Sequence, residues 1–237
     1  MYFRTPLIHG WECQSRERID LTIIFDFDGT LADSKACSIL ATQAAFKACH
    51  LVVPEEDSIA HYMGIPIEQS FKEMANIDLT KQAFNELLTT FRSYYKQFEN
   101  DTLQLFPGMM EVLAQLQKRH VKCFVVSSKK TDVLKRNLVT LKIESFFQDC
   151  IGSDQVQHYK PHPQGIEILL ERFRLEAKDC LMVGDAIFDI QMGKRAGCQT
   201  CAVTWGSHSK EMLQSAQPDF VVEQVEDLLS IGLVEEN

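Results

Sequence analysis

The sequence predicts an α/β fold, with a Rossmann-like parallel sheet core covered by helices on both faces and an all-helical domain inserted after the first strand. Two observations lead to this prediction. Short apolar runs alternate with segments of helical periodicity over most of the chain, which is the pattern of parallel strands joined by crossover helices. One long stretch near the N-terminal end breaks the alternation, because it contains helical patterns and no strand-like run.

The first predicted strand, residues 21–26, reads Leu-Thr-Ile-Ile-Phe-Asp. A short apolar run rich in β-branched residues, without polar alternation, is typical of a strand that is buried on both faces. Similar runs follow at residues 121–126, 180–183 and 199–203, with a weaker one at residues 148–151. Apolar residues recur at helical spacing in the segments between them, over residues 109–116, 133–141 and 166–173.

The interrupted stretch divides the chain into three predicted parts. We expect an N-terminal arm at residues 1–20, a helical cap domain at residues 35–103, and a core domain made of residues 21–34 and 104–237. Pro107 and Gly108 indicate the return to the sheet. We expect the flexible points of the chain near Ser34 and between Leu103 and Pro107, where the cap would join the core.

Composition limits the possible partners and location. The chain has 237 residues, a formal net charge of -9 and 45% hydrophobic residues, which is ordinary for a globular protein but unfavourable for binding nucleic acid or an anionic membrane. The first twenty residues lack a long apolar stretch and no run could span a bilayer, so we expect a cytoplasmic protein.

Cys198 and Cys201 have CxxC spacing, but no second cysteine or histidine pair accompanies them, which favours reduced thiols over a zinc or redox site. Nothing in the sequence indicates an oligomeric state.

Two aspartates close the first predicted strand. Asp26 and Asp28 are separated by one residue, and Gly29 follows them. A turn would account for Asp28 before Gly29, but a second carboxylate within a buried run is costly unless a cation balances it. Carboxylate oxygens are the preferred ligands of hard divalent cations. The pair therefore indicates a divalent-cation site.

Further polar residues follow the later strands. They are Ser127 and Ser128, Lys160 before Pro161, and the second acidic pair Asp185 and Asp189. The carboxyl ends of parallel strands meet at one edge of the sheet, and ligands bind there. The two serines suit a phosphate oxygen, and they suit a helix cap equally well. The sequence therefore predicts one shared site that combines two acidic pairs, hydroxyl groups and a lysine.

As a set, these residues resemble the haloacid dehalogenase-like superfamily of phosphotransferases, in the order that the family shows. The matching elements are the DxDGT motif at residues 26–30, the strand-terminal Ser127, Lys160 before its proline-rich turn, and the GDxxxD motif that contains Asp185 and Asp189. The match covers about residues 21–206. The all-helical insertion and the stretch from residue 196 to 206 are similar to the phosphoglycolate phosphatase-like branch.

The resemblance implies a Mg²⁺-dependent phosphatase that hydrolyses a small, phosphoglycolate-like metabolite through an aspartyl-phosphate. Asp26 would be the nucleophile and Asp28 the general acid and base. The implied ligands of Mg²⁺ are Asp26, Asp28 through its backbone carbonyl, Asp185 and Asp189, and the implied phosphate-binding residues are Thr30, Ser127, Ser128 and Lys160. Ser128 and Ala186 stand where many relatives carry Asn and Ser or Thr, so exact substrate contacts do not transfer.

Several alternatives remain open at this point. Asp28 argues against a dehalogenase or a phosphonate-cleaving relative, because those lack an acidic residue at this position. An inorganic pyrophosphatase of the same branch and a β-phosphoglucomutase-like mutase would share every motif. A non-catalytic phosphate-binding protein is least favoured, because no carboxylate or lysine of the set is missing. Met63, Gly64, Ile65 and Pro66 are candidate cap contacts to the substrate.

Overall fold

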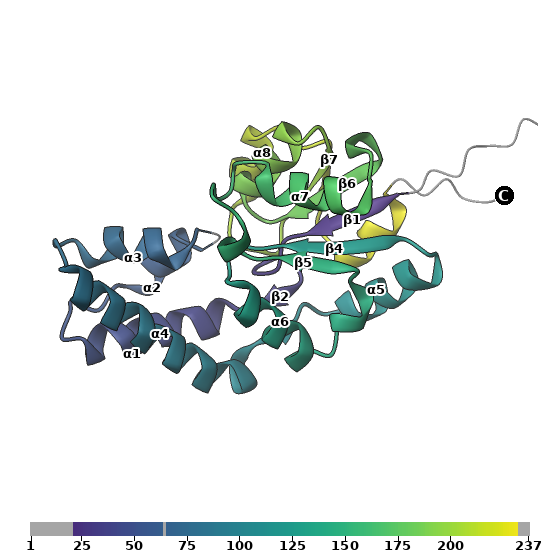
Figure 1. The fold of residues 1–237 in the computed structure, drawn as a ribbon. Coiled ribbons are helices and arrows are strands. Elements are labelled where there is room, and N and C mark those ends of the chain that lie inside the picture. Colours follow the sequence, from purple (N-terminus) through teal and green to yellow (C-terminus); the bar gives the residue numbers. More distant parts are fainter. Residues whose placement is uncertain (1–20, 64, 232–237) are drawn as a thin grey trace, which may run out of the picture.

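A computed structural model describes residues 21–63 and 65–231, so the predicted arm at residues 1–20 lies outside the described part of the chain. A parallel six-stranded sheet lies at its centre, in the order β5–β4–β1–β6–β7–β8 (Figure 1). Its strands are β1 (Thr22–Phe25), β4 (Lys122–Val126), β5 (Asp149–Ile151), β6 (Cys180–Gly184), β7 (Gln199–Val203) and β8 (Phe220–Val222). The predicted α/β class is confirmed. The sequence did not predict edge strand β8, because it is three residues long and only half-buried.

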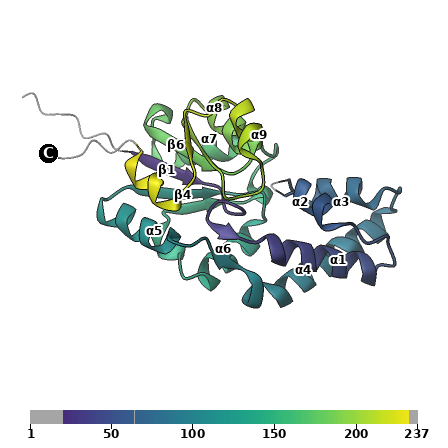
Figure 2. The ribbon, with the colours of Figure 1, turned by 180° about the vertical axis from the view of Figure 1, so that it is seen from behind.

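Successive residues of the central strands pack into two different cores, as the period of two in a strand requires. Ile23 and Phe25 belong to one apolar cluster, and Ile24 between them belongs to another. Helices α5 and α6 contribute to the first cluster and α7 and α8 to the second. Figures 1 and 2 show these two pairs of helices on opposite faces of the sheet. The sheet is therefore buried on both sides, which is why its strands read as continuous apolar runs.

The remaining elements follow the crossover pattern. The helices after the insertion are α5 (Met109–Lys118), α6 (Thr131–Thr140), α7 (Gln164–Phe173), α8 (Ile187–Arg195) and α9 (Lys210–Ser215). Short 3₁₀ turns occur at η1 (Glu144–Phe146), η2 (Ser153–Gln155), η3 (Ala177–Asp179) and η4 (Val225–Ser230). No helix in the described part of the chain is both long and apolar enough to cross a membrane.

Within the described part of the chain, four helices lie between residues 34 and 103 and stand to one side of the sheet (Figures 1 and 2). They are α1 (Lys35–Ala48), α2 (Glu56–His61), α3 (Ile67–Ala75) and α4 (Lys81–Thr102), and together they are called the helical insert below. The insert has its own apolar cluster, built around edge-to-face contacts of Phe71 with Phe46 and Phe91 at 5.4 and 5.0 Å between ring centroids.

The two connections between the insert and the sheet pair with each other. Strands β2 (Ala32–Asp33) and β3 (Gln104–Leu105) form a small antiparallel ribbon, in which Ala32 lies opposite Leu105. Ser34, which precedes α1, is fully buried. These connections were expected to be the flexible points, and the sequence did not predict that they would pair, because two-residue strands leave no periodic pattern.

A buried carboxylate also joins the insert to the core. Glu99, near the end of α4, accepts hydrogen bonds from Arg136 Nε and Nη2 at 2.6 and 3.0 Å and from Asn137 Nδ2 at 2.8 Å. Both of these donor residues, Arg136 and Asn137, belong to α6. Bidentate geometry with an additional amide donor makes this a strong contact between the two parts of the chain.

Glu99→Leu should therefore lower the free energy of unfolding by about 2–3 kcal/mol, because Arg136 and Asn137 lose a shared acceptor. Arg136 is one-third exposed, which keeps the cost below that of a fully buried pair. Urea denaturation measures the change. Glu86→Leu, on the exposed face of the same helix, is the matched control and should change the free energy by less than about 0.5 kcal/mol. Equal losses in both variants would contradict a specific role for Glu99.

Candidate active site

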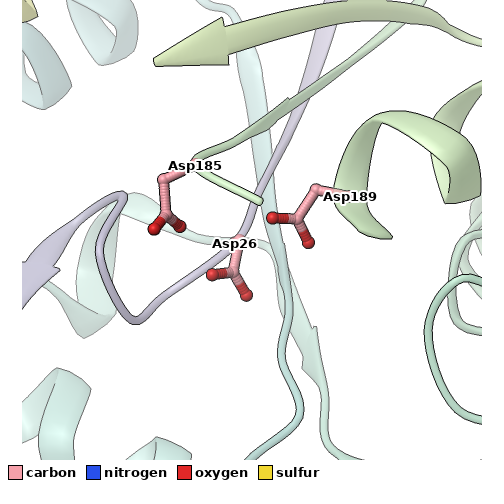
Figure 3. A group of neighbouring side chains, drawn as sticks. All are labelled: Asp26, Asp185 and Asp189. Atoms are coloured by element: carbon pink, nitrogen blue, oxygen red, sulfur yellow. The ribbon is translucent and has the colours of Figure 1, made fainter. Parts of the chain in front are cut away.

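Three buried carboxylates meet at the carboxyl edge of the sheet. Asp26 follows β1, Asp185 follows β6 and Asp189 lies in the first turn of α8. Figure 3 shows their side chains turned toward one another from three separate segments. One oxygen from each lies within 4.8 Å of the others, and each residue is almost fully buried. The tertiary structure thus brings Asp26 of the first predicted acidic pair together with both members of the second pair.

The backbone around Asp26 allows the three carboxylates to lie this close together. The Asp26 amide donates to the Val183 carbonyl at 2.9 Å, which extends the β1–β6 ladder to the first carboxylate. Gly29 then turns the chain at φ +78°, a conformation that residues with a side chain rarely adopt. A Cβ atom at Gly29 would lie 2.2 Å from Asp185 Oδ2, so both the turn and the close packing of the centre require glycine.

Lys160 supplies the positive charge at this centre. Its Nζ lies 2.5 Å from Asp26 Oδ1 and 2.7 Å from Asp189 Oδ1, and the side chain is buried. Burial alone would lower the pKa of Lys160, but Asp189 and Asp26 raise it above its ordinary value. Lys160 therefore stays charged, and it binds two of the carboxylates through charge-assisted hydrogen bonds.

Lys160 does not offset all of the burial cost and mutual repulsion of the three carboxylates. Burial raises the pKa of Asp26 well above its ordinary value, opposed by Lys160 and reinforced by the neighbouring aspartates. Burial and Asp189 raise the pKa of Asp185 to about 6, although the Ser207 amide and the Thr30 hydroxyl stabilise its charged form. One lysine therefore does not balance three buried negative charges.

Thr30 and Ser207 fix the orientation of Asp185. The Thr30 hydroxyl donates to Asp185 Oδ1 at 3.0 Å, and the Ser207 amide donates to Oδ2 at 2.7 Å. We therefore expect Thr30, which the motif suggested as a phosphate-binding residue, to orient this carboxylate. The sequence analysis did not single out Ser207, whose amide hydrogen bond to Asp185 depends on the tertiary structure.

The Asp28 side chain does not belong to the three-carboxylate centre and has partners of its own. Its Oδ1 accepts a hydrogen bond from Ser34 Oγ and lies 3.0 Å from Lys129 Nζ. Lys129 in turn donates to the Tyr95 hydroxyl of α4 at 2.8 Å and lies 4.2 Å from the centroid of that ring. Burial would lower the pKa of Lys129, but Asp28 raises it above its ordinary value. Lys129 and Tyr95 were not among the predicted site residues; the one available signal was the place of Lys129 directly after the two serines.

The two serines end β4 beside this centre. Ser127 is buried; its amide donates to the Ile151 carbonyl at 3.0 Å, and its hydroxyl accepts from the Lys129 amide at 3.1 Å. No side-chain cap bond begins α6, whose N-cap is Lys130, so the structure disfavours the helix-cap interpretation of these serines. Ser128 lines the cavity described next.

A cavity of about 380 Å³ opens between the helical insert and the carboxyl edge of the sheet. Asp26 and Asp28 line it from the core, and residues of α1 to α4 line it from the insert. Met63 and Ile65, two of the candidate cap contacts, are part of the lining, while Gly64 lies outside the described residues.

The centre fits a divalent cation. Asp26, Asp185 and Asp189 present hard oxygen donors at mutual distances that one ion could bridge, and their excess negative charge is a reason to bind one. The side chain of Asp28 does not belong to this donor set, which agrees with an expected contribution through its backbone carbonyl alone. A cation bound here would lower the pKa of each ligating carboxyl.

The fold and this site define an α/β protein with an acidic, lysine-balanced centre at the carboxyl edge of a parallel sheet. Residues 23–203 match the family model of haloacid dehalogenase-like hydrolases, and the chain belongs to this family.

Curated relatives and solved structures agree with this assignment. Pyrophosphatase PpaX of Oceanobacillus iheyensis is 32% identical over 210 residues, covering 89% of this chain and 95% of the relative. Pyrophosphatase PpaX of Listeria monocytogenes is 32% identical over 217 residues, covering 91% and 97%. The crystal structure described as a predicted phosphoglycolate phosphatase from Haemophilus somnus superposes with a TM-score of 0.84 at 26% identity, covering 90% of this chain and 99% of that one.

Mg²⁺ should stabilise the protein through the three-carboxylate centre, and more so at about pH 7.5 than at about pH 5. The pKa of Asp185 is raised from 3.8 to about 6, so the stability that its protonated form contributes is present below pH 3.8 and is lost as pH rises through about 6. A cation replaces that lost contribution at neutral pH. At a hundredfold excess over Kd, the melting temperature should rise by roughly 5–10 °C.

Thermal unfolding followed by circular dichroism measures this shift, with Na⁺ at equal ionic strength as the control. Asp185→Asn removes one charge from the centre, so it should abolish the Mg²⁺ shift without destabilising the metal-free protein. The same Mg²⁺ shift in Asp185→Asn as in the wild type would contradict this site.

Proposed function

We propose that the protein is a Mg²⁺-dependent phosphatase that hydrolyses small phosphate monoesters through an aspartyl-phosphate at Asp26. The observation that carries the proposal is the centre itself, where Asp26 lies between two further carboxylates and Lys160. The repulsion between a carboxylate nucleophile and an anionic phosphate must be offset by positive charge, and this centre offers Lys160 together with a donor set that suits a divalent cation. Family membership supports a hydrolase.

In the first proposed step, one Asp26 oxygen attacks phosphorus while the bond from phosphorus to the leaving oxygen breaks. Asp28 gives a proton to that leaving oxygen. In the second step, Asp28 takes a proton from water, the water oxygen attacks phosphorus, and the bond to Asp26 breaks to release phosphate. Splitting the displacement through an enzyme carboxylate is an established strategy.

The surrounding residues would support both steps. Asp26, Asp185 and Asp189 would hold Mg²⁺ together with the Asp28 backbone carbonyl, and the ion would offset charge on the phosphoryl oxygens. Lys160 would also neutralise Asp26 when the anionic substrate approaches. Ser127 and Ser128, at the end of β4, would donate hydrogen bonds to phosphoryl oxygens.

Ser34 and Lys129 would keep the Asp28 carboxylate in place for its two proton transfers. Ser34 directly precedes α1 and Lys129 contacts Tyr95 of α4, so both tie Asp28 to the helical insert. We propose that residues 35–103 act as a cap, which would exclude water from the site when it closes.

A second candidate function is pyrophosphate hydrolysis, favoured by the names of the two relatives that are 32% identical. It would use the same centre, with phosphate as the leaving group. A phosphosugar mutase is a further alternative, distinguished by isomerisation without net phosphate release. An assay of phosphate release from phosphoglycolate, sugar phosphates, nucleotides and pyrophosphate separates these three activities.

Asp26→Asn should reduce phosphate release by at least about 10³-fold while the protein remains folded, because an amide cannot form the aspartyl-phosphate. Phosphate release with Mg²⁺ measures the loss, and circular dichroism checks the fold. Asp78→Asn, an exposed aspartate before α4, is the control and should leave turnover unchanged. Turnover near the wild-type level in Asp26→Asn would reject Asp26 as the nucleophile.

Asp28→Asn should slow turnover by about 10²–10⁴-fold on alkyl phosphates, because it removes the general acid and base. The loss should be smaller for release of p-nitrophenol from p-nitrophenyl phosphate, because that leaving group departs without protonation. Single-turnover rates for the two substrates measure the difference. A change below about threefold on alkyl phosphates would count against the proposed role.

A further inference from the structure

We infer that the preferred substrate is a phosphate monoester whose leaving group has an uncharged, apolar body larger than glycolate. The part of the cavity wall that the helical insert forms, called the cap wall below, would select against a second phosphate. The inference rests on the proposed phosphatase function and concerns the same site. It goes beyond that function because it specifies what the phosphate is attached to.

The size of the cavity is the first reason. Its volume is about 380 Å³. Pyrophosphate and phosphoglycolate would occupy only the part beside Asp26 and Asp28. Volumes of this order are typical of pockets that enclose larger organic ligands. A small dianion would leave most of the space to water.

The chemistry of the cap wall is the second reason. Ile65, Ile67 and Met74 line the cavity and are partly exposed, and the buried Phe71 and Phe91 also belong to the lining. These side chains offer no hydrogen-bond donor to a phosphate. Placing a charged group against them costs desolvation energy, whereas covering them with apolar surface is favourable.

The distribution of charge is the third reason. Arg92 Nη2 lies 2.7 Å from Glu68 Oε1, and Lys130 Nζ lies 3.8 Å from the same oxygen. A second phosphate in this part of the cavity would have to displace Glu68 or be repelled by it. Within the described lining, Lys96 is the cation without an ion pair, and it lies exposed on α4.

The remaining cations of the lining are also engaged. Lys129 pairs with Asp28, and Arg136 pairs with Glu99. Arg92, Lys129, Lys130 and Arg136 therefore already have carboxylate partners, whereas Lys160 lies in the catalytic centre where the phosphoryl group would bind. One phosphate group and one apolar body match this arrangement better than two phosphates.

A series of unbranched alkyl phosphates tests the inference, because every member has the same kind of leaving oxygen. Each methylene that reaches the apolar wall should raise kcat/KM by about fourfold. Hexyl phosphate should therefore exceed propyl phosphate by at least about tenfold, and it should also exceed pyrophosphate and phosphoglycolate. Phosphate release with Mg²⁺ is the readout.

Two methionine variants test whether the cap wall causes the preference for hexyl over propyl phosphate. Met74→Gln keeps the size of the side chain but makes the wall polar, and it should lower the ratio of kcat/KM for hexyl over propyl phosphate by at least about threefold. Met212→Gln, an exposed methionine on α9, is the matched control and should leave the ratio unchanged. Ile67→Thr provides a second cap variant should Met74→Gln fail to fold.

Four results would overturn the inference. Equal kcat/KM for hexyl and propyl phosphate, or a higher value for pyrophosphate than for hexyl phosphate, would reject it while leaving the phosphatase function intact. The same loss of ratio in Met74→Gln and Met212→Gln would reject the cap wall as its source. Absence of phosphate release from every compound would reject the proposed function and the inference together.

Discussion

The contact of Lys160 with Asp26 and Asp189 is the interaction on which the rest of the site depends. Three carboxylates lie within 4.8 Å of one another in a buried position, and a single buried ammonium group cannot neutralise them all. Burial, reinforced by the neighbouring carboxylates, raises the pKa values of Asp26 and Asp185. The fold tolerates the excess charge because hydrogen bonds hold each carboxylate, and because the centre is suited to a further cation.

This electrostatic constraint explains several features of the surrounding chain. Thr30 and Ser207 donate to Asp185, and the amide of Ala186 donates to Asp189 Oδ2 at 3.1 Å. Gly29 has no side chain because a Cβ atom there would overlap the Asp185 carboxylate. Strand order places β1 between β4 and β6, so the end of β1 delivers the central aspartate. The packing of this edge is therefore determined by charge as much as by apolar burial.

The helical insert contributes a second, different environment. Its wall of the cavity includes apolar side chains, and its Arg92 is paired with Glu68, so we propose that it distinguishes substrates by the body attached to the phosphate. Contacts at Glu99 and Tyr95 link this wall to α6 and to Lys129, and hence to Asp28. The part of the protein proposed to select the substrate is thereby connected to the group proposed to transfer the proton.

The sequence by itself determined the α/β class, the strands that carry polar residues at their ends, and the acidic pairs with Lys160, because each of these depends on local pattern or on residue type. It did not determine the β2–β3 pairing or edge strand β8, because such short elements have no periodicity. It also gave no indication of Tyr95 or Ser207, whose partners lie far away in the chain. Only the tertiary structure decided which carboxylates meet, that Asp28 turns toward Ser34 and Lys129 instead of joining them, and what lines the cavity, because these outcomes depend on distances between segments that the chain order does not specify.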